Sequence, residues 1–329
     1  MTRLEETVRA QGLLAEGRAV VVMYSGGRDS TCLLDLAVRV AGPPAVSALH
    51  VNYGLRATAD ADERHCASVC ERLGIQLDVR RPARAGDRGG NLQAWAREER
   101  YRAAADLALA RGADVAVGHT RSDQVETILY RMASSPSRRA VLGMVARDGP
   151  VVRPLLSFTR EQTGTYCAEH ALRWREDETN DSGAYARNRI RRELVPAFER
   201  IHPAAAENLL ALAEILRGEA EVLDELVEGV LGGRAEIAVS TLAELPPALR
   251  RLVVQRLADE AHGGPAAGVA RRAEEVAAMP ARGTAALDLP SGVRATARDG
   301  LVTFGRTPKG VREGARAPGD ENTRGEAPT

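Results

Sequence analysis

One short segment near the N-terminus limits the folds that this chain can adopt. The apolar run at 19–24 has the residue types of a buried strand, and a helical pattern begins at Thr31. Between them lies the turn Ser25–Ser30, SGGRDS. Glycines in such a turn let backbone N–H groups approach a phosphate, and the helix that follows favours negative charge at its N-terminus. This order of elements predicts a phosphate-binding loop.

Strand and helix patterns continue to alternate after this loop. Further strands are predicted at 46–51, 75–80 and 114–118, and helices at 1–17, 60–73, 91–111 and 123–133. This alternation is typical of a parallel sheet with helices on both faces. We therefore predict an α/β, doubly wound, Rossmann-like catalytic domain over residues 1–200.

The pattern changes from about Pro203 onward. Helical patterns dominate there, with short alternating runs between 285 and 304. We predict a second, mainly helical domain over 201–305 that contains a small β-hairpin. Residues 306–329 show no periodicity and are rich in Gly, Pro, Arg and Glu, so a disordered tail is predicted.

Composition and charge exclude several classes of protein. The chain has 329 residues, of which 44% are hydrophobic and 27% charged, and its formal net charge is zero. A neutral total argues against a protein that coats nucleic acid nonspecifically. The four cysteines form no C-x-x-C pair, and no apolar leader or membrane-length stretch is present. These features favour a cytoplasmic protein.

The turn itself indicates which ligand it binds. Its serines add hydroxyl donors to the backbone N–H groups, whereas Asp29 would repel a phosphate and is better explained as a holder of Mg²⁺. The turn is neither a Walker loop nor a dinucleotide fingerprint. It resembles the loop of the PP-loop, or N-type ATP pyrophosphatase, superfamily, of the adenine nucleotide alpha hydrolase-like fold, whose members cleave ATP between the α- and β-phosphates. The resemblance implies that ATP and Mg²⁺ are cofactors, with ATP bound by Ser25, Gly26, Gly27, Arg28, Asp29 and Ser30.

Four further segments narrow this superfamily. They are LHVNYGLR at 49–56, NLQAWAREERY at 91–101, GHTRSDQVET at 118–127, and DETN at 177–180 followed by RNRIR at 187–191. Together they resemble the tRNA(Ile)-lysidine synthase family, densely over residues 18–200 and more loosely to about 305. Thr120 and Ser122 depart from the pattern, because the family often has a second His and an acid there.

The resemblance implies a reaction and its partners. The chain would ligate L-lysine to C2 of the wobble cytidine of a CAU-anticodon tRNA(Ile), through an adenylated cytidine, with release of pyrophosphate and AMP. The lysidine formed would change codon specificity from AUG to AUA and tRNA identity from Met to Ile. The family leads us to expect a monomer or a homodimer.

Several side chains are candidates for this chemistry. Asp123 and Glu126 are three apart and share a helix face, where they could hold Mg²⁺ or an ammonium group, or simply favour the helix dipole. His119 follows a strand at the edge where α/β folds bind ligands, and it is our first choice of base for the lysine amine.

Basic residues form a second group of candidates. Arg97 and Arg100 lie three apart on one predicted helix and suit contact with a phosphate, although exposed arginines are also common there. The run that contains Arg187, Asn188, Arg189 and Arg191 suits either the ATP phosphates or the tRNA backbone. Asn52 and Arg56 are predicted to contact substrate or RNA.

Three other readings stay open at this stage. A tRNA 2-thiolation enzyme of the same superfamily would activate a base in the same way but deliver sulfur. A PP-loop amidotransferase-type ligase would act on a small metabolite. A non-enzymatic ATP-sensing or tRNA-binding module would keep the loop without turnover.

Overall fold

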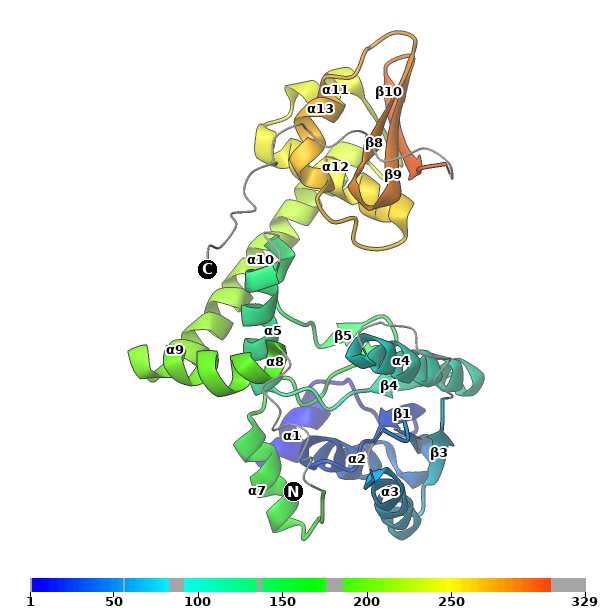
Figure 1. The fold of residues 1–329 in the computed structure, drawn as a ribbon, viewed down its shortest axis with the longest axis vertical. Helices are drawn as coiled ribbons and strands as arrows, with labels where there is room; N and C mark the ends of the chain where they lie inside the picture. The colour runs from blue at the N-terminus through cyan, green and yellow to red at the C-terminus, as the bar shows by residue number, and fades with distance from the viewer. Residues whose placement is uncertain (1, 56, 83–91, 135–137, 176–185, 309–329) are drawn as a thin grey trace, which may run out of the picture. The chain divides into compact units, whose positions relative to one another are not determined.

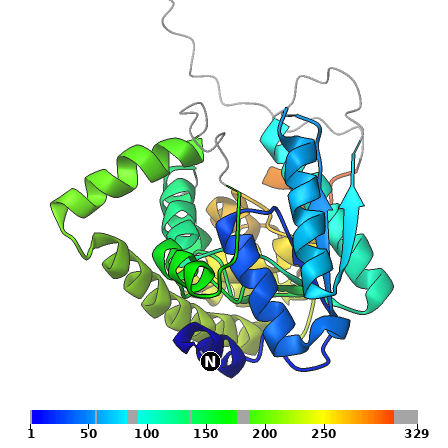
Figure 2. The same cartoon turned by 90° about the horizontal axis from the view of Figure 1, so that it is seen from below.

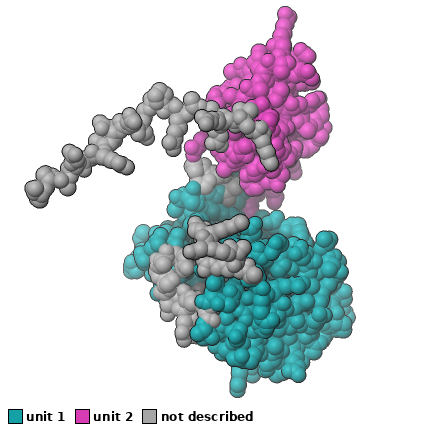
Figure 3. Space-filling view, turned by 45° about the vertical axis from the view of Figure 1, so that its right-hand side comes forward, with its two compact units in different colours: residues 1–216 teal, residues 217–329 magenta. Residues whose placement is uncertain are grey.

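The computed structural model describes residues 2–55, 57–82, 92–134, 138–175 and 186–308. The chain divides into two compact units, residues 1–216 and 217–329 (Figure 3). The division falls inside one long helix, α10 (Ala205–Leu231), and a domain boundary after residue 200 stays a prediction. Within the described residues, no helix is both long enough and apolar enough to cross a membrane.

A six-stranded sheet forms the centre of the first unit. Its order is β3-β2-β1-β4-β6-β5, in which β5 alone runs antiparallel to its neighbour. The strands are β1 (Val20–Met23), β2 (Val46–Val51), β3 (Gln76–Arg80), β4 (Asp114–Ala116), β5 (Arg147–Asp148) and β6 (Val151–Val152). The chain builds outward from β1 to β3 and then returns to the other side of β1. The carboxyl ends of β1 and β4 therefore form the switch point, where such sheets bind ligands.

Helices cover both faces of this sheet, as the sequence predicts (Figure 1). On one face lie α1 (Arg3–Ala10), α2 (Arg28–Ala41), α3 (Ala59–Leu73) and α7 (Arg160–Glu169), and on the other lies α4 (Leu92–Arg111). Figure 2 looks from the side that α2 and α3 cover. Alternation along β1 explains the two layers, because Val20 and Val22 pack with the first group whereas Val21 and Met23 pack with α4.

The remaining helices of this unit pack beside the sheet. They are α5 (Arg121–Ser134), α6 (Arg138–Val141), α8 (Ala186–Arg189), the π-helical turn η3 (Ile190–Leu194) and α9 (Val195–Ile201). Ile128 of α5 is fully buried against Leu209 and Ala213 of α10. The first helix is shorter than predicted: it ends at Ala10, and Gly12 then takes a left-handed φ of 64°.

The second unit contains more sheet than the predicted hairpin. Its four strands follow the order β7-β10-β9-β8, and the three pairings are antiparallel. They are β7 (Glu236–Ala238), β8 (Thr284–Leu289), β9 (Val293–Arg298) and β10 (Leu301–Arg306), packed with α11 (Val239–Glu244), α12 (Pro247–His262), the 3₁₀ turn η4 (Val269–Arg272) and α13 (Ala273–Ala277). Of the predicted tail, residues 309–329 lie outside the described residues.

Candidate active site at the β1–β4 switch point

The loop after β1 is closed by its own serines. The Ser30 hydroxyl donates to the Gly27 carbonyl at 2.9 Å and lies 3.0 Å from the Ser25 hydroxyl. Gly26 has a φ of 83°, and a Cβ there would come within 3.0 Å of the Cys66 sulfur. Gly27 offers no capping side chain, so the first turn of α2 presents its N–H groups to a ligand.

The segment after β4 packs directly on this loop. A Cβ added at Gly118 would lie 3.2 Å from the carbonyl carbon and oxygen of Asp29 and 3.3 Å from the Ser30 nitrogen. Backbone therefore meets backbone at this point, and only glycine allows so close an approach. The close packing places His119 and the start of α5 beside the phosphate loop.

Asp29 lies at the first turn of α2 and is held from α7. Thr163 donates its hydroxyl to Asp29 at 2.6 Å, and the Arg160 Nε lies 3.5 Å from the other carboxylate oxygen. The Nε of the neighbouring Arg28 lies 3.4 Å from the Asp29 oxygen that accepts from Thr163. Sequence reasoning missed Arg160 and Thr163, because their segment carries a helix-capping pattern and no chemical signature.

Asp123 is fixed by the start of its own helix. The backbone N–H and the hydroxyl of Thr120 both donate to one carboxylate oxygen at 2.8 Å, and Arg160 contacts the other at 3.3 Å. Burial opposes the charged form, but Arg160 and the Thr120 donors outweigh it and hold the pKa of Asp123 below its ordinary value. Thr120, a departure from the family pattern, thus acts in this chain as the anchor of Asp123.

Glu126 pairs with the basic run that follows α7 in the chain. Arg191 donates to both of its oxygens, at 2.5 and 2.9 Å, and also lies 3.7 Å from Asp123. The charges therefore alternate in one chain of contacts: Asp29, Arg160, Asp123, Arg191 and Glu126. This chain links the phosphate loop to the acidic pair predicted from the sequence.

A pocket of about 160 Å³ opens beside this chain of charges. Its lining comprises Arg97, His119, Asp123, Glu126, Thr127, Arg131, Met144, Asp148, Arg153 and Arg187. Half of these were predicted: Arg97, His119, Asp123, Glu126 and Arg187. Arg131 and Arg153, which sequence reasoning missed, make the pocket more basic than expected. Burial, and then three neighbouring arginines, lower the pKa of Arg131.

His119 faces the pocket as a neutral side chain. Its Nδ1 is buried and has no hydrogen-bond partner among the described residues. Burial lowers the pKa of His119 to about 4, although nearby Asp123 opposes this shift. A group with so low a pKa is a weak acceptor for the proton of an ammonium group, whose ordinary pKa is about 10.4. His119 is thus a weak base that can still take part in hydrogen bonds, and its role as the base for the lysine amine stays a prediction.

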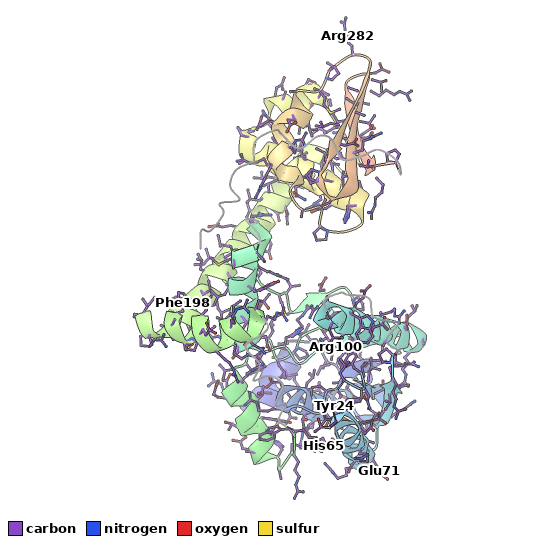
Figure 4. All side chains as sticks on the ribbon, viewed as in Figure 1. Tyr24, His65, Glu71, Arg100, Phe198 and Arg282 are labelled. Carbon is purple, nitrogen blue, oxygen red and sulfur yellow. The ribbon has the colours of Figure 1, made fainter. Side chains whose placement is uncertain are left out.

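The other predicted residues lie at different places. Arg97 stacks on the Tyr101 ring at 4.7 Å and reaches the pocket. Arg100, on the same helix and labelled in Figure 4, is not among the residues that line the pocket. Asn52 is buried and donates to Asp60 and Glu63 at 3.0 and 2.9 Å, which anchors the turn after β2. Asn188 and Arg189 lie on α8 outside the pocket lining, and Arg56 is outside the described residues.

The donor set suits Mg²⁺ bound together with phosphate. Among the described side chains, no three His, Cys, Asp or Glu residues gather into a metal site of their own. Asp29 and Asp123, however, both contact one guanidinium, that of Arg160, so their carboxylates already share a cation. Mg²⁺ commonly uses one or two carboxylates and completes its shell with phosphate and water.

Comparison with known proteins first assigns the catalytic unit to a class. Residues 2–198 match the family model described as a PP-loop domain. The fold is similar to that of a solved structure, the U34-tRNA thiolase NcsA from Methanococcus maripaludis with its [4Fe-4S] cluster. The TM-score is 0.54 at 16% identity, over 65% of this chain and 78% of that one. The chain is a PP-loop protein.

Curated relatives define the family within that class. A tRNA(Ile)-lysidine synthase from Symbiobacterium thermophilum is 35% identical over 96% of this chain and 71% of its own length. One from Salinispora arenicola is 35% identical over 90% of this chain and 93% of its own length. A third, from Pseudomonas fluorescens, is 38% identical over 63% of this chain and 48% of its own length. The chain belongs to the tRNA(Ile)-lysidine synthase family and is an ATP-dependent enzyme of the ligase type.

Proposed function

We propose that this chain ligates L-lysine to the wobble cytidine of a CAU-anticodon tRNA(Ile). One observation carries the proposal: a continuous chain of ion pairs joins the phosphate loop at Asp29 to the acidic pair at Asp123 and Glu126. An ATP-activating loop and a site for an amino group thus lie side by side. The name that the relatives share, tRNA(Ile)-lysidine synthase, supports the choice of this tRNA and of lysine.

The loop provides the activating half of the reaction. ATP binds with its phosphates on the N–H groups at Gly26–Ser30, and bound Mg²⁺, held by Asp29, would neutralise phosphate charge. The cytosine O2 attacks the α-phosphorus, and the bond to the bridging oxygen breaks to release pyrophosphate. Anticodon bases are single-stranded, so presenting the cytidine costs little stacking energy.

The acidic pair provides the second half. Asp123 and Glu126 hold the amino group of lysine at the pocket, and neutral His119 accepts or donates a hydrogen bond beside them. The unprotonated ε-amine of lysine attacks C2 of the activated cytidine, the C2–O2 bond breaks, and AMP leaves with that oxygen. The amine loses one proton in this step. Arg97 and Arg187, on the pocket wall, suit the phosphate of the leaving AMP or the tRNA backbone.

A single incubation tests the proposal. Purified protein is mixed with ATP, labelled lysine and a transcript of tRNA(Ile) with a CAU anticodon, and elongator methionine tRNA serves as the control. We expect label in the isoleucine tRNA only. Asp29→Asn should abolish incorporation, because the carboxylate that would share Mg²⁺ is lost. Full activity of that variant would remove Asp29 from the mechanism.

The tRNA 2-thiolation reading predicts sulfur incorporation when the same assay is run with labelled sulfide in place of lysine. The positions of the cysteines count against it. Cys32, Cys66, Cys70 and Cys167 are at most 1% exposed, and they pack in the core on the α2 and α3 side of the sheet. Sulfur incorporation without lysine incorporation would overturn the lysine proposal.

A further inference from the structure

Arg160 is shared between the two halves of the site. Its Nε lies 3.5 Å from Asp29 on the phosphate loop, and its Nη2 lies 3.3 Å from Asp123 at the pocket. Its side chain is 27% exposed, so solvent screens the charge only in part. A guanidinium is rigid and planar, and it cannot move toward one carboxylate without changing its contact with the other.

The hold of Arg160 on Asp29 is loose. Its Nε is buried, yet within the described residues it makes no hydrogen bond of good geometry. Thr163 already donates to Asp29 at 2.6 Å, so this carboxylate keeps one partner when the arginine leaves. A buried donor without an acceptor is costly. The Nε is therefore ready to bind a phosphate oxygen that arrives at the loop.

The contact with Asp123 has the opposite effect on the pocket. There Arg160 occupies the carboxylate oxygen that Thr120 does not use, and Arg191 lies 3.7 Å from that same oxygen. An amino group that binds Asp123 must compete with this guanidinium. Removing Arg160 from Asp123 would therefore strengthen the binding of a cation in the pocket.

We propose that Arg160 is a positioning residue that couples ATP binding to amino-acid binding. ATP phosphates draw the guanidinium toward the loop, which frees Asp123 for the amino group of lysine. The inference rests on the proposed function, because it takes lysine as the pocket ligand. Coupling between two binding sites is reciprocal, so lysine must strengthen ATP binding by the same factor, for which we expect about tenfold.

Calorimetry on the full chain, without tRNA, measures this coupling. A non-cleavable α,β-methylene analogue of ATP and L-lysine are each titrated in the absence and presence of the other. In the wild type we expect each ligand to lower the Kd of the other about tenfold. In Arg160→Gln the two ligands should bind independently. Lysine alone should bind this variant more tightly than it binds the wild type, a change that loss of a merely structural residue would not produce.

Two further variants make the test decisive. Arg39→Gln removes another arginine–aspartate contact, with Asp35 in the middle of α2, and should keep the wild-type coupling. Arg160→Lys keeps the positive charge but lacks the planar guanidinium, and it should show reduced coupling. This variant replaces Arg160→Gln if the glutamine variant does not fold. Lysine binding that is uncoupled in the wild type, or coupling that persists without Arg160, overturns the inference alone. No lysine binding even with the nucleotide analogue overturns the proposed function as well.

Discussion

Gly118→Ala perturbs the contact on which the site depends. The added Cβ would lie 3.2 Å from the Asp29 carbonyl and 3.3 Å from the Ser30 nitrogen, which is closer than ordinary van der Waals contact. Both neighbours are backbone atoms in the first turn of α2 and cannot move without moving the phosphate loop. Overpacking of this kind costs about 1–3 kcal/mol. If about 1.4 kcal/mol of that strain opposes nucleotide binding, affinity falls tenfold.

The assay is titration of the α,β-methylene ATP analogue by calorimetry, together with urea unfolding. Gly218→Ala is the matched control, because Gly218 lies inside α10 with no atom within 4 Å of an added Cβ. There alanine should stabilise the helix by about 0.5–1 kcal/mol and leave nucleotide affinity unchanged. Equal nucleotide affinity in the two variants would refute the idea that Gly118 sets the position of the loop.

Two further predictions concern the pocket. Burial lowers the pKa of His119 from 6.5 to about 4, so between pH 4 and 6.5 the unfolded state binds more protons than the folded state. The free energy of unfolding therefore falls as the pH drops from 7 to 5, by about 1–2 kcal/mol for this group. Urea unfolding at both pH values should show a smaller fall in His119→Gln, and an unchanged fall would contradict the burial argument. Arg191→Met leaves buried Glu126 without its main partner and should cost about 3 kcal/mol. Adding Glu126→Gln should recover most of that loss, and a single variant as stable as the wild type would show that the pair is unimportant.

The sequence was sufficient to predict the parallel sheet and the loop. The mainly apolar runs at 19–24, 46–51 and 114–118 have a direct physical cause in strands buried on both faces. The edge strands β5 and β6 were not predicted, because two-residue strands leave no period to detect. Strand β7 was not predicted either, because its three residues are too few to show a period. The sheet of the second unit was therefore predicted only as a hairpin.

The candidate site shows a similar limit. Asp29, Asp123 and Glu126 sit in motifs whose spacing carries chemical information, and the structure places them in one chain of contacts. Arg160 and Thr163 enter that chain through tertiary packing of α7 on α2. No local pattern in the sequence encodes such a contact.

Trapping of the activated tRNA tests most directly the claim that the phosphate loop activates the tRNA and the acidic pair binds lysine. ATP labelled at the α-phosphate is incubated with the tRNA(Ile) transcript without lysine, and lysine is then added as a chase. We expect label on the tRNA, released as AMP by the chase. Glu126→Gln should form the labelled tRNA but release AMP slowly, whereas Asp29→Asn should form none. Label found on lysine instead of tRNA would contradict this account. So would a Glu126→Gln variant that cannot form the activated tRNA but releases AMP at the normal rate when activated tRNA is supplied to it.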